Sequence, residues 1–276
     1  MSVRFRSFVR TFVRTFVIAA TIAVPFAGAG AQRTEHTADF KWSDQLAAGR
    51  WARVSNINGT ITLGRATGDK VEVTAVKRWT RGNPDDVQIE ARKDGEDVVI
   101  CALWGGQKSC DESNGRRHHS RWNDDNNDDD VSVDFTVLIP KGVKINASSV
   151  NGRVDVTGAT AEAQVSAVNG TVRVETSTGP LSVATVNGNV HARISGESAT
   201  TDMSFTTVNG SVYAELPANF GADVRMTTVN GSLNSDYPMT VQGRIDPHNL
   251  SAHVGAPGGP RITLTTVNGS IDLRKR

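Results

Sequence analysis

The residues best suited to metal chemistry lie in one polar segment, GGQKSCDESNGRRHHSRWNDDNNDDD, at positions 105–130. Hard cations such as Ca²⁺ prefer several carboxylate and carbonyl oxygens. The segment supplies five candidate ligands, which are Asp124, Asp125, Asp128, Asp129 and Asp130. Their spacing does not match an EF-hand loop, because the glycine and the closing glutamate are absent. A solvated loop without metal is the alternative. We expect no cofactor, with Ca²⁺ the one ion the segment could hold.

Two other reactive residue types occur near this segment. His118 and His119 are adjacent, and no Cys-x-x-Cys or spaced histidine completes a zinc ligand set with them. Cys101 and Cys110 are the only cysteines, and in an oxidising compartment two such thiols pair. We therefore predict a structural disulfide between them and no metal or redox role for either residue type.

The N-terminus predicts export. Four arginines precede an apolar run at about 16–27, and Ala29-Gly30-Ala31 supplies small residues before Gln32, as in a cleaved secretory signal peptide. The apolar run is shorter than the roughly 20 residues of a spanning helix, although a retained anchor is the alternative. We predict a signal peptide at 1–31, a lead-in at 32–49 and a repeat domain at 50–276 with a polar insertion at 105–130. The expected location is the periplasm, cell surface or extracellular space, with no transmembrane segment after cleavage.

The elements that must position any site come from one unit, which the chain repeats seven times. Asn-Gly follows a Val or Ile in every copy, at Ile57, Val150, Val168, Val186, Val208, Val229 and Val267. Apolar and polar residues alternate on both sides of each Asn-Gly, which predicts two short strands per unit. Regular periods of about 20–50 residues are typical of repeat architectures.

Two all-β architectures fit this repeat. In an antiparallel β-meander each Asn-Gly is a hairpin turn, whereas in a β-solenoid, a parallel β-helix-like stack, each V-N-G is a corner. In a hairpin the Val before Asn would point away from the other apolar columns and expose a long apolar stripe, which soluble proteins avoid. We therefore predict the solenoid, with this Val pointing inward at the corner.

Parallel stacking would align polar side chains in columns about 4.8 Å apart. One predicted column contains Asp155, Arg173, His191 and Tyr213, and a second contains Thr157, Glu175, Arg193, Glu215 and Asp236. Opposite charges on neighbouring strands stabilise such a stack. From these columns we predict Arg173, His191, Arg193 and Tyr213 as residues that contact a ligand.

Repeated V-N-G-x-V-x-V units behind an export signal resemble the bacterial "putative adhesin" family, domain of unknown function 4097. The resemblance covers about residues 50–276 and includes the closing segment GGPRITLTTVNGSIDLR. It implies a β-solenoid-like exported domain with suspected adhesive or envelope roles. It supplies no catalytic residues.

Composition and motifs narrow the function further. Loss of residues 1–31 removes four of the 30 basic residues and none of the 29 acidic ones, which leaves a net charge of −3 and argues against nucleic-acid binding. There is no G-x-S-x-G, P-loop or dinucleotide motif and no obvious acid/base pair. We expect a non-enzymatic adhesive or structural domain whose polar face meets a glycan, another envelope component or a protein. The alternatives are a carbohydrate-active enzyme on a β-helix and a periplasmic docking scaffold.

Overall fold

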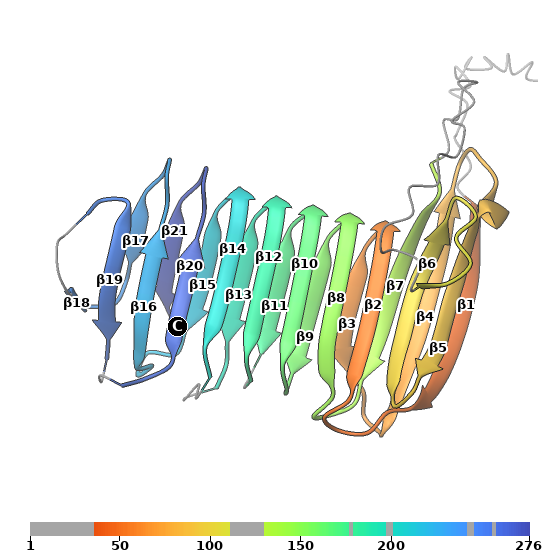
Figure 1. Cartoon of the computed structure of the whole chain (residues 1–276), viewed down its shortest axis with the longest axis horizontal. Coiled ribbons are helices and arrows are strands. Elements are labelled where there is room, and N and C mark those ends of the chain that lie inside the picture. The colour runs from red at the N-terminus through yellow and green to blue at the C-terminus, as the bar shows by residue number, and fades with distance from the viewer. Residues whose placement is uncertain (1–35, 111–129, 177–178, 197–200, 242–245, 256–257) are drawn as a thin grey trace, which may run out of the picture. The chain divides into compact units, whose positions relative to one another are not determined.

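The computed structural model describes residues 36–110, 130–176, 179–196, 201–241, 246–255 and 258–276. The predicted signal peptide lies outside these ranges. Within them the fold is all-β, with two large mixed sheets and one 3₁₀ turn, η1 (Pro84–Asp86). Figure 1 shows the two sheets as two layers of strands.

The two sheets are named A and B here and are described in their spatial order. Sheet A consists of β1 (His36–Gln45), β4 (Lys70–Trp79), β7 (Ser132–Ile139), β3 (Ile61–Arg65), β9 (Val154–Ala159), β11 (Val172–Thr176), β13 (Val190–Ile194), β15 (Val212–Leu216), β21 (Ile271–Lys275) and β17 (Leu233–Ser235). Sheet B consists of β18 (Met239–Val241), β19 (Asn249–Val254), β16 (Ala222–Thr227), β20 (Arg261–Thr265), β14 (Met203–Asn209), β12 (Leu181–Asn187), β10 (Ala163–Asn169), β8 (Lys144–Asn151), β2 (Trp51–Asn58), β6 (Asp97–Trp104) and β5 (Val87–Asp94).

Each Asn-Gly turn connects a strand of sheet B to a strand of sheet A. Strand β10 pairs in parallel with β8 and with β12, and β11 likewise pairs in parallel with β9 and β13. The pairing aligns Asn151, Asn169 and Asn187. The two strands of a unit therefore do not form a hairpin with each other, and the meander alternative is wrong for these units.

The last two units are exchanged in space. The unit formed by β20 and β21 lies between the unit of β14 and β15 and the unit of β16 and β17, although it comes last in the chain. Glu215 consequently pairs with Arg274 rather than standing beside Asp236. The predicted second column is therefore wrong at its final member, because chain order and stacking order differ there.

Antiparallel strands close both ends of the parallel stack. At one end β4 pairs antiparallel with β1 and β7, and β5 pairs antiparallel with β6. Strand β1, within the predicted lead-in, pairs with β4 along its whole length of ten residues. At the other end β19 pairs antiparallel with β16 and β18. Terminal repeats with altered structure are the usual way in which a stack of repeats ends.

The core lies between the sheets, and in the central repeat units buried and outward side chains alternate along the strands. Most of its side chains are Val, Ala, Leu and Ile, with Phe135, Phe205 and Phe220 as fully buried aromatic residues. In β10, for example, Ala163, Val165 and Ala167 point inward, and the residues between them are exposed. Small and β-branched side chains suit a narrow space between two sheets.

The orientation of the Val before each Asn-Gly differs from the prediction. The Val before Asn-Gly points outward, and six of the seven positions are exposed, with relative accessibilities of 37–58%. Alternation continues through the end of the strand, so the residue before this Val faces inward instead. That residue is Thr in the later units, and its hydroxyl satisfies a backbone carbonyl of the corner: Thr207 Oγ1 donates to Gly188 O at 2.8 Å, and Thr266 Oγ1 donates to Gly210 O at 2.8 Å.

The asparagines of the seven corners form a continuous ladder. From Asn151 onward, each Nδ2 donates to the Oδ1 of the Asn one step nearer to Asn58, over distances of 2.8 to 3.0 Å. The spatial order is Asn58, Asn151, Asn169, Asn187, Asn209, Asn268 and Asn230. The ladder explains why Asn recurs at every turn, since one different side chain would break two hydrogen bonds.

Candidate functional site

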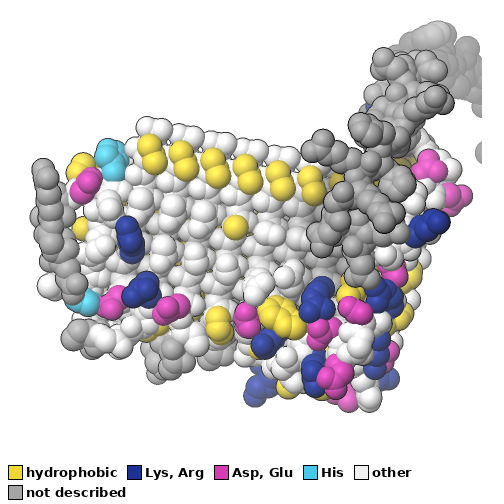
Figure 2. Space-filling view, in the orientation of Figure 1, with side chains coloured by type: hydrophobic (Ala, Val, Ile, Leu, Met, Phe, Trp, Pro, Cys, Tyr) yellow, Lys and Arg dark blue, Asp and Glu magenta, His cyan; other side chains and the backbone are white. Residues whose placement is uncertain are grey.

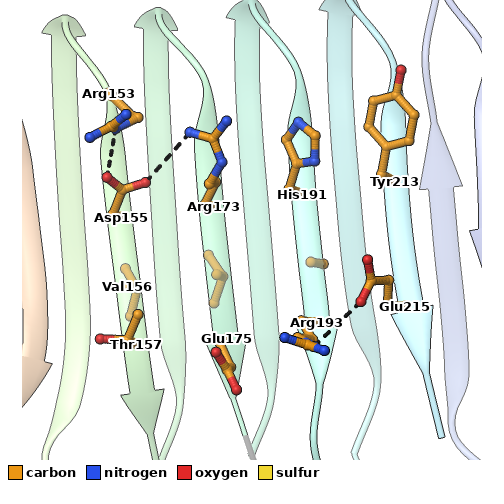
Figure 3. A pocket seen from close by; sticks show the side chains of 12 residues that line it. Arg153, Asp155, Val156, Thr157, Arg173, Glu175, His191, Arg193, Tyr213 and Glu215 are labelled. Atoms are coloured by element: carbon orange, nitrogen blue, oxygen red, sulfur yellow. Dashed lines mark ion pairs between the residues drawn. The ribbon is translucent and has the colours of Figure 1, made fainter. Parts of the chain in front are cut away.

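An open groove lies on the outer face of sheet A, over β9, β11, β13 and β15. Its volume is about 560 Å³. Alternate residues of these strands point out of the sheet into it, and Figure 3 shows their side chains lying in two rows across the strands. The rows exist because the four strands are parallel and in register, so side chains at equivalent positions become neighbours.

One end of the groove is built around Asp155. Arg153 Nε lies 2.6 Å from Asp155 Oδ2, and Arg173 Nη1 lies 3.9 Å from Asp155 Oδ1 (Figure 3). The Asp155 side chain is only 19% exposed. Its Oδ1 is buried and accepts no hydrogen bond from the described residues. A buried carboxylate oxygen without a hydrogen bond is uncommon in folded proteins.

The middle of the groove contains a stack of rings. His191 and Tyr213 are adjacent across β13 and β15, with ring centroids 4.8 Å apart and an interplanar angle of 16°. The guanidinium of Arg274 lies over the Tyr213 ring, 5.7 Å from its centroid. Burial, and secondarily the charge of Arg173, lowers the pKa of His191 from its ordinary value of 6.5. The imidazole is therefore neutral at physiological pH and can both donate and accept a hydrogen bond.

The second row lies further along the same strands. Arg193 Nε is 3.4 Å from Glu215 Oε2, and both side chains are nearly half exposed. Glu175 stands beside Arg193 in the register of β11 and β13. On the other side of Glu175 the register of β9 shifts by one residue, because β9 carries an irregularity opposite β11. The groove thus presents alternating planar cations and carboxylates on a rigid sheet.

The structure brings together all four residues predicted to contact a ligand. Arg173, His191, Arg193 and Tyr213 line the groove. Sequence reasoning missed Arg153, which follows the Asn-Gly turn and lies outside the column pattern. It also missed Arg274, which reaches Tyr213 only because the last two units are exchanged in space. The position of Arg153 two residues before Asp155 is a signal that could have found the first of these.

The predicted metal ligands lie almost entirely outside the described residues. Asp124, Asp125, Asp128 and Asp129 fall there, as do His118 and His119. Asp130 is described, and its carboxylate accepts hydrogen bonds from the backbone N–H groups of Thr80 and Arg81, each at 2.8 Å. It also contacts the Thr80 hydroxyl. Asp130 therefore anchors the end of the polar segment to the turn after β4.

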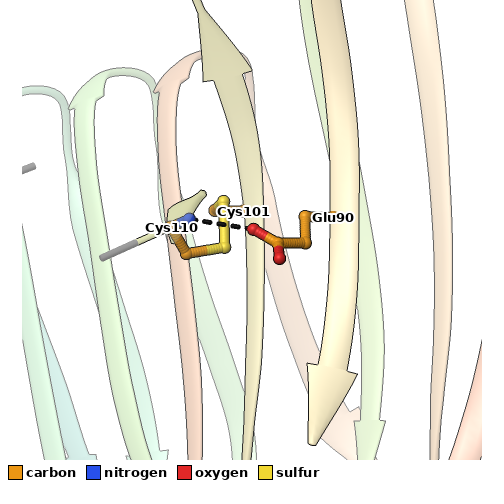
Figure 4. A group of neighbouring side chains, drawn as sticks. All are labelled: Glu90, Cys101 and Cys110. Atoms are coloured by element: carbon orange, nitrogen blue, oxygen red, sulfur yellow. Dashed lines mark hydrogen bonds between the residues drawn. A yellow bond between two sulfur atoms is a disulfide. The ribbon is translucent and has the colours of Figure 1, made fainter. Parts of the chain in front are cut away.

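The predicted disulfide between Cys101 and Cys110 is present, with the two Cα atoms 5.8 Å apart. Cys101 is buried in β6, and Cys110 follows the turn after that strand. Glu90 of β5 accepts a hydrogen bond from the Cys110 backbone N–H at 2.8 Å (Figure 4). Both sulfur atoms are used in the covalent bond, so this cluster fixes the start of the polar segment and offers no thiolate to a metal.

A known protein family matches more than half of this chain. Residues 105–274 match the family described as Toastrack DUF4097. The chain belongs to this family. The family is a domain of unknown function. Membership therefore establishes a β-rich repeat fold and does not identify a ligand. A comparison with curated proteins finds no match.

Several solved structures are similar to this Toastrack chain. A "putative cell adhesion protein" from Clostridium sporogenes is 11% identical, with 87% of this chain and 100% of that chain covered and a TM-score of 0.48. A "putative adhesin" from Bacteroides fragilis is 12% identical, with 88% and 98% covered and a TM-score of 0.40. A "putative lipid binding protein" from Parabacteroides distasonis is 10% identical, with 87% and 96% covered and a TM-score of 0.27. Among the described residues, no helix is long and apolar enough to span a membrane.

Proposed function

We propose that this Toastrack domain is an exported, non-enzymatic β-solenoid that binds a polyhydroxylated ligand, such as an envelope glycan, in the groove on sheet A. The parallel, in-register stacking of the V-N-G units supports the solenoid assignment. A rigid sheet with side chains at fixed spacing suits recognition rather than chemistry that needs moving groups.

The observation that carries the ligand assignment is the joint presence of Arg173 and a neutral His191 in one open groove. A ligand hydroxyl would accept a hydrogen bond from the Arg173 guanidinium and donate one to the unprotonated ring nitrogen of His191, which is the pairing a hydroxyl can make at once. Three arginines and three acidic residues line the groove, so its formal charges balance and favour an uncharged ligand over an anionic or cationic one.

The same contacts argue against catalysis. Asp155 faces two arginines, and Glu215 faces Arg193. Both carboxylates are thus already held by guanidinium groups. This supports a role in binding over a role in proton transfer.

A glycan array with matched variants tests this proposal. We expect saturable binding of the purified protein that falls by at least about tenfold in Arg173→Ala and in Tyr213→Ala, because each loses a direct contact. Arg225→Ala is the matched control, since Arg225 is an exposed arginine on the outer face of sheet B, and it should bind as the unaltered protein does. The array is repeated with calcium and with chelator.

Each outcome of the array has a distinct meaning. Equal loss in all three variants, or no loss in any, would place the ligand elsewhere and contradict the groove assignment. Binding that requires calcium would direct attention to the acidic residues 124–130. Absence of binding to any glycan or to washed cells would leave a structural or protein-docking role.

We also propose that the domain reaches the envelope or the medium after removal of residues 1–31. The disulfide supports an oxidising compartment, because such bonds persist there and are rare in reducing ones. Intact mass spectrometry of the protein recovered from the periplasm or medium should show a chain that begins at Gln32. A recovered chain that retains its first residue would contradict processing.

A further inference from the structure

The outer face of sheet B carries an unbroken apolar stripe. In spatial order it consists of Val150, Val168, Val186, Val208, Val267 and Val229, each 37–58% exposed. Figure 2 shows this row of hydrophobic side chains along one end of the face. Neighbouring strands are about 4.8 Å apart, so the stripe is about 29 Å long when the width of its outer residues is included. Contiguous exposed apolar surfaces larger than a few hundred Å² mark interaction sites.

The surface beside the stripe is uncharged. The adjoining row consists of Ser148, Ser166, Ala184, Thr206 and Thr265 from β8 to β20. The next row across the same strands contains only Asn, Gln, Ser and Thr. Charged residues flank this second row, with Arg53 on β2 at one side and Arg225 on β16 at the other. Figure 2 shows how few charged side chains lie over the central strands.

The stripe alone is too small to hold a stable partner. It is about 29 Å long and roughly 7 Å wide, or about 200 Å². With the two hydroxyl- and amide-bearing rows the face measures about 29 Å by 20 Å, or about 580 Å² on each partner before the pleat is counted. Two such faces approach the roughly 1,200 Å² at which specific protein–protein interfaces begin. A stable dimer therefore needs the whole face.

We propose that two copies of this chain pair through the outer faces of sheet B, with stripe against stripe. A two-fold axis parallel to the strands achieves this, because it keeps the stripe at the same end of both faces and reverses the order of the strands. Val186 of one copy then lies against Val208 of the other, beside the axis. Small neutral side chains allow two sheets to pack at about 10 Å, and the absence of charge in the central rows avoids repulsion.

The pairing extends the proposed function without depending on it. Sheet A faces away from sheet B in each copy, so a dimer through sheet B directs the two grooves in opposite directions. Two ligands on separate surfaces could then be bridged, with an avidity that one groove cannot provide. Arg173→Ala should weaken ligand binding and leave self-association unchanged, so the two proposals fail separately.

Sedimentation velocity tests the pairing. We expect the purified protein to shift from monomer to dimer between about 1 µM and about 200 µM, as interfaces at the lower end of the size range do. Val186→Lys and Val208→Glu should each weaken self-association by at least about tenfold, because a charge then faces an apolar partner. An equimolar mixture of the two variants should restore the dimer, since the introduced ammonium and carboxylate groups would face each other across the axis.

Thr136→Lys is the matched control, because Thr136 is an exposed strand residue on sheet A. It should associate like the unaltered protein, and thermal melting of each variant verifies that it is folded. A protein that stays monomeric at about 200 µM would overturn the proposal. Self-association that survives both single substitutions, or a mixture that fails to restore the dimer, would overturn the stated geometry.

Discussion

Across the same central repeats, the outer face of sheet A carries arginines, carboxylates and two stacked rings, whereas the outer face of sheet B carries hydroxyls, amides and a row of valines. Both faces come from the same units, with one strand on each side of every Asn-Gly turn. The inner faces of both sheets are alike, and most of their side chains are Val, Ala, Leu and Ile.

The difference between the two outer faces shows which positions the fold constrains and which it allows to vary. Core positions and corners must repeat because neighbouring units touch there, so any change affects the stack. Outward positions have no such constraint. Variation from unit to unit on sheet A creates a local site, and uniformity on sheet B creates a regular surface. We therefore assign ligand binding to the varied face and self-association to the uniform one.

The largest expected loss of stability comes from substitutions in the Asn-Gly corners, which join the strands of the two sheets. A Cβ at Gly170 would lie 2.0 Å from the backbone oxygen of Gly152, which cannot move without distorting the next unit. Gly170→Ala should lower the free energy of unfolding by about 3 kcal/mol, as measured by urea denaturation. Gly68→Ala is the control, since nothing lies within 4 Å of a Cβ there. Equal stability of the two variants would contradict the tight corner.

The neighbouring residues Thr207 and Val208 test which side chains at the end of β14 face the core and which face outward. Thr207 is 1% exposed and donates to Gly188 O, whereas Val208 is 37% exposed. Thr207→Val should lower the free energy of unfolding by about 1 kcal/mol, because the partly buried Gly188 carbonyl loses this donor. Val208→Thr should change stability by less than about 0.5 kcal/mol. Denaturation at low protein concentration measures both, and a larger cost at Val208 would reverse the assigned orientation.

Arg193 tests the charge column on sheet A. It stands between Glu175 and Glu215, so Arg193→Glu places three carboxylates in line, whereas Arg193→Ala only removes an ion pair. The exposed pair itself is worth little. We expect Arg193→Glu to be less stable than Arg193→Ala by about 0.5 to 1 kcal/mol. Variants that melt at the same temperature would argue against registered strands in this sheet.

The smallest expected effect is the contribution of His191 to the pH dependence of the free energy of unfolding. Its pKa lies below 6.5 in the folded protein because of burial and the nearby Arg173, so the unfolded chain takes up the proton at a higher pH than the folded one. The free energy of unfolding should therefore fall as the pH drops from 6.5 to the folded pKa. In His191→Gln this part of the slope should disappear. An unchanged slope between about pH 5 and about pH 7 would show that other groups cause it.

Much of the fold could be predicted from the sequence, since alternation and the repeated Asn-Gly identify two strands per unit and their parallel stack. The disulfide and the four groove residues also followed from spacing. The predicted inward orientation of Val168 and its equivalents is wrong, because strand alternation continues up to the turn and outweighs the cost of exposed apolar surface. The place of β20 and β21 could not be predicted, because nearly identical V-N-G units fit the edges of β14 and β15 equally well.

The exchanged order of the last units is the most direct test of this account, since the order of the Val stripe and the contact of Arg274 with Tyr213 both depend on where β20 and β21 lie. Val208 and Val267 are on adjacent parallel strands about 4.8 Å apart, whereas Val208 and Val229 are two strands, or about 9.6 Å, apart. A disulfide needs Cα atoms within about 7 Å. We predict that Val208→Cys with Val267→Cys cross-links on oxidation and that Val208→Cys with Val229→Cys does not, as read by peptide mass spectrometry. The reverse result would show that the units stack in chain order and would contradict the account.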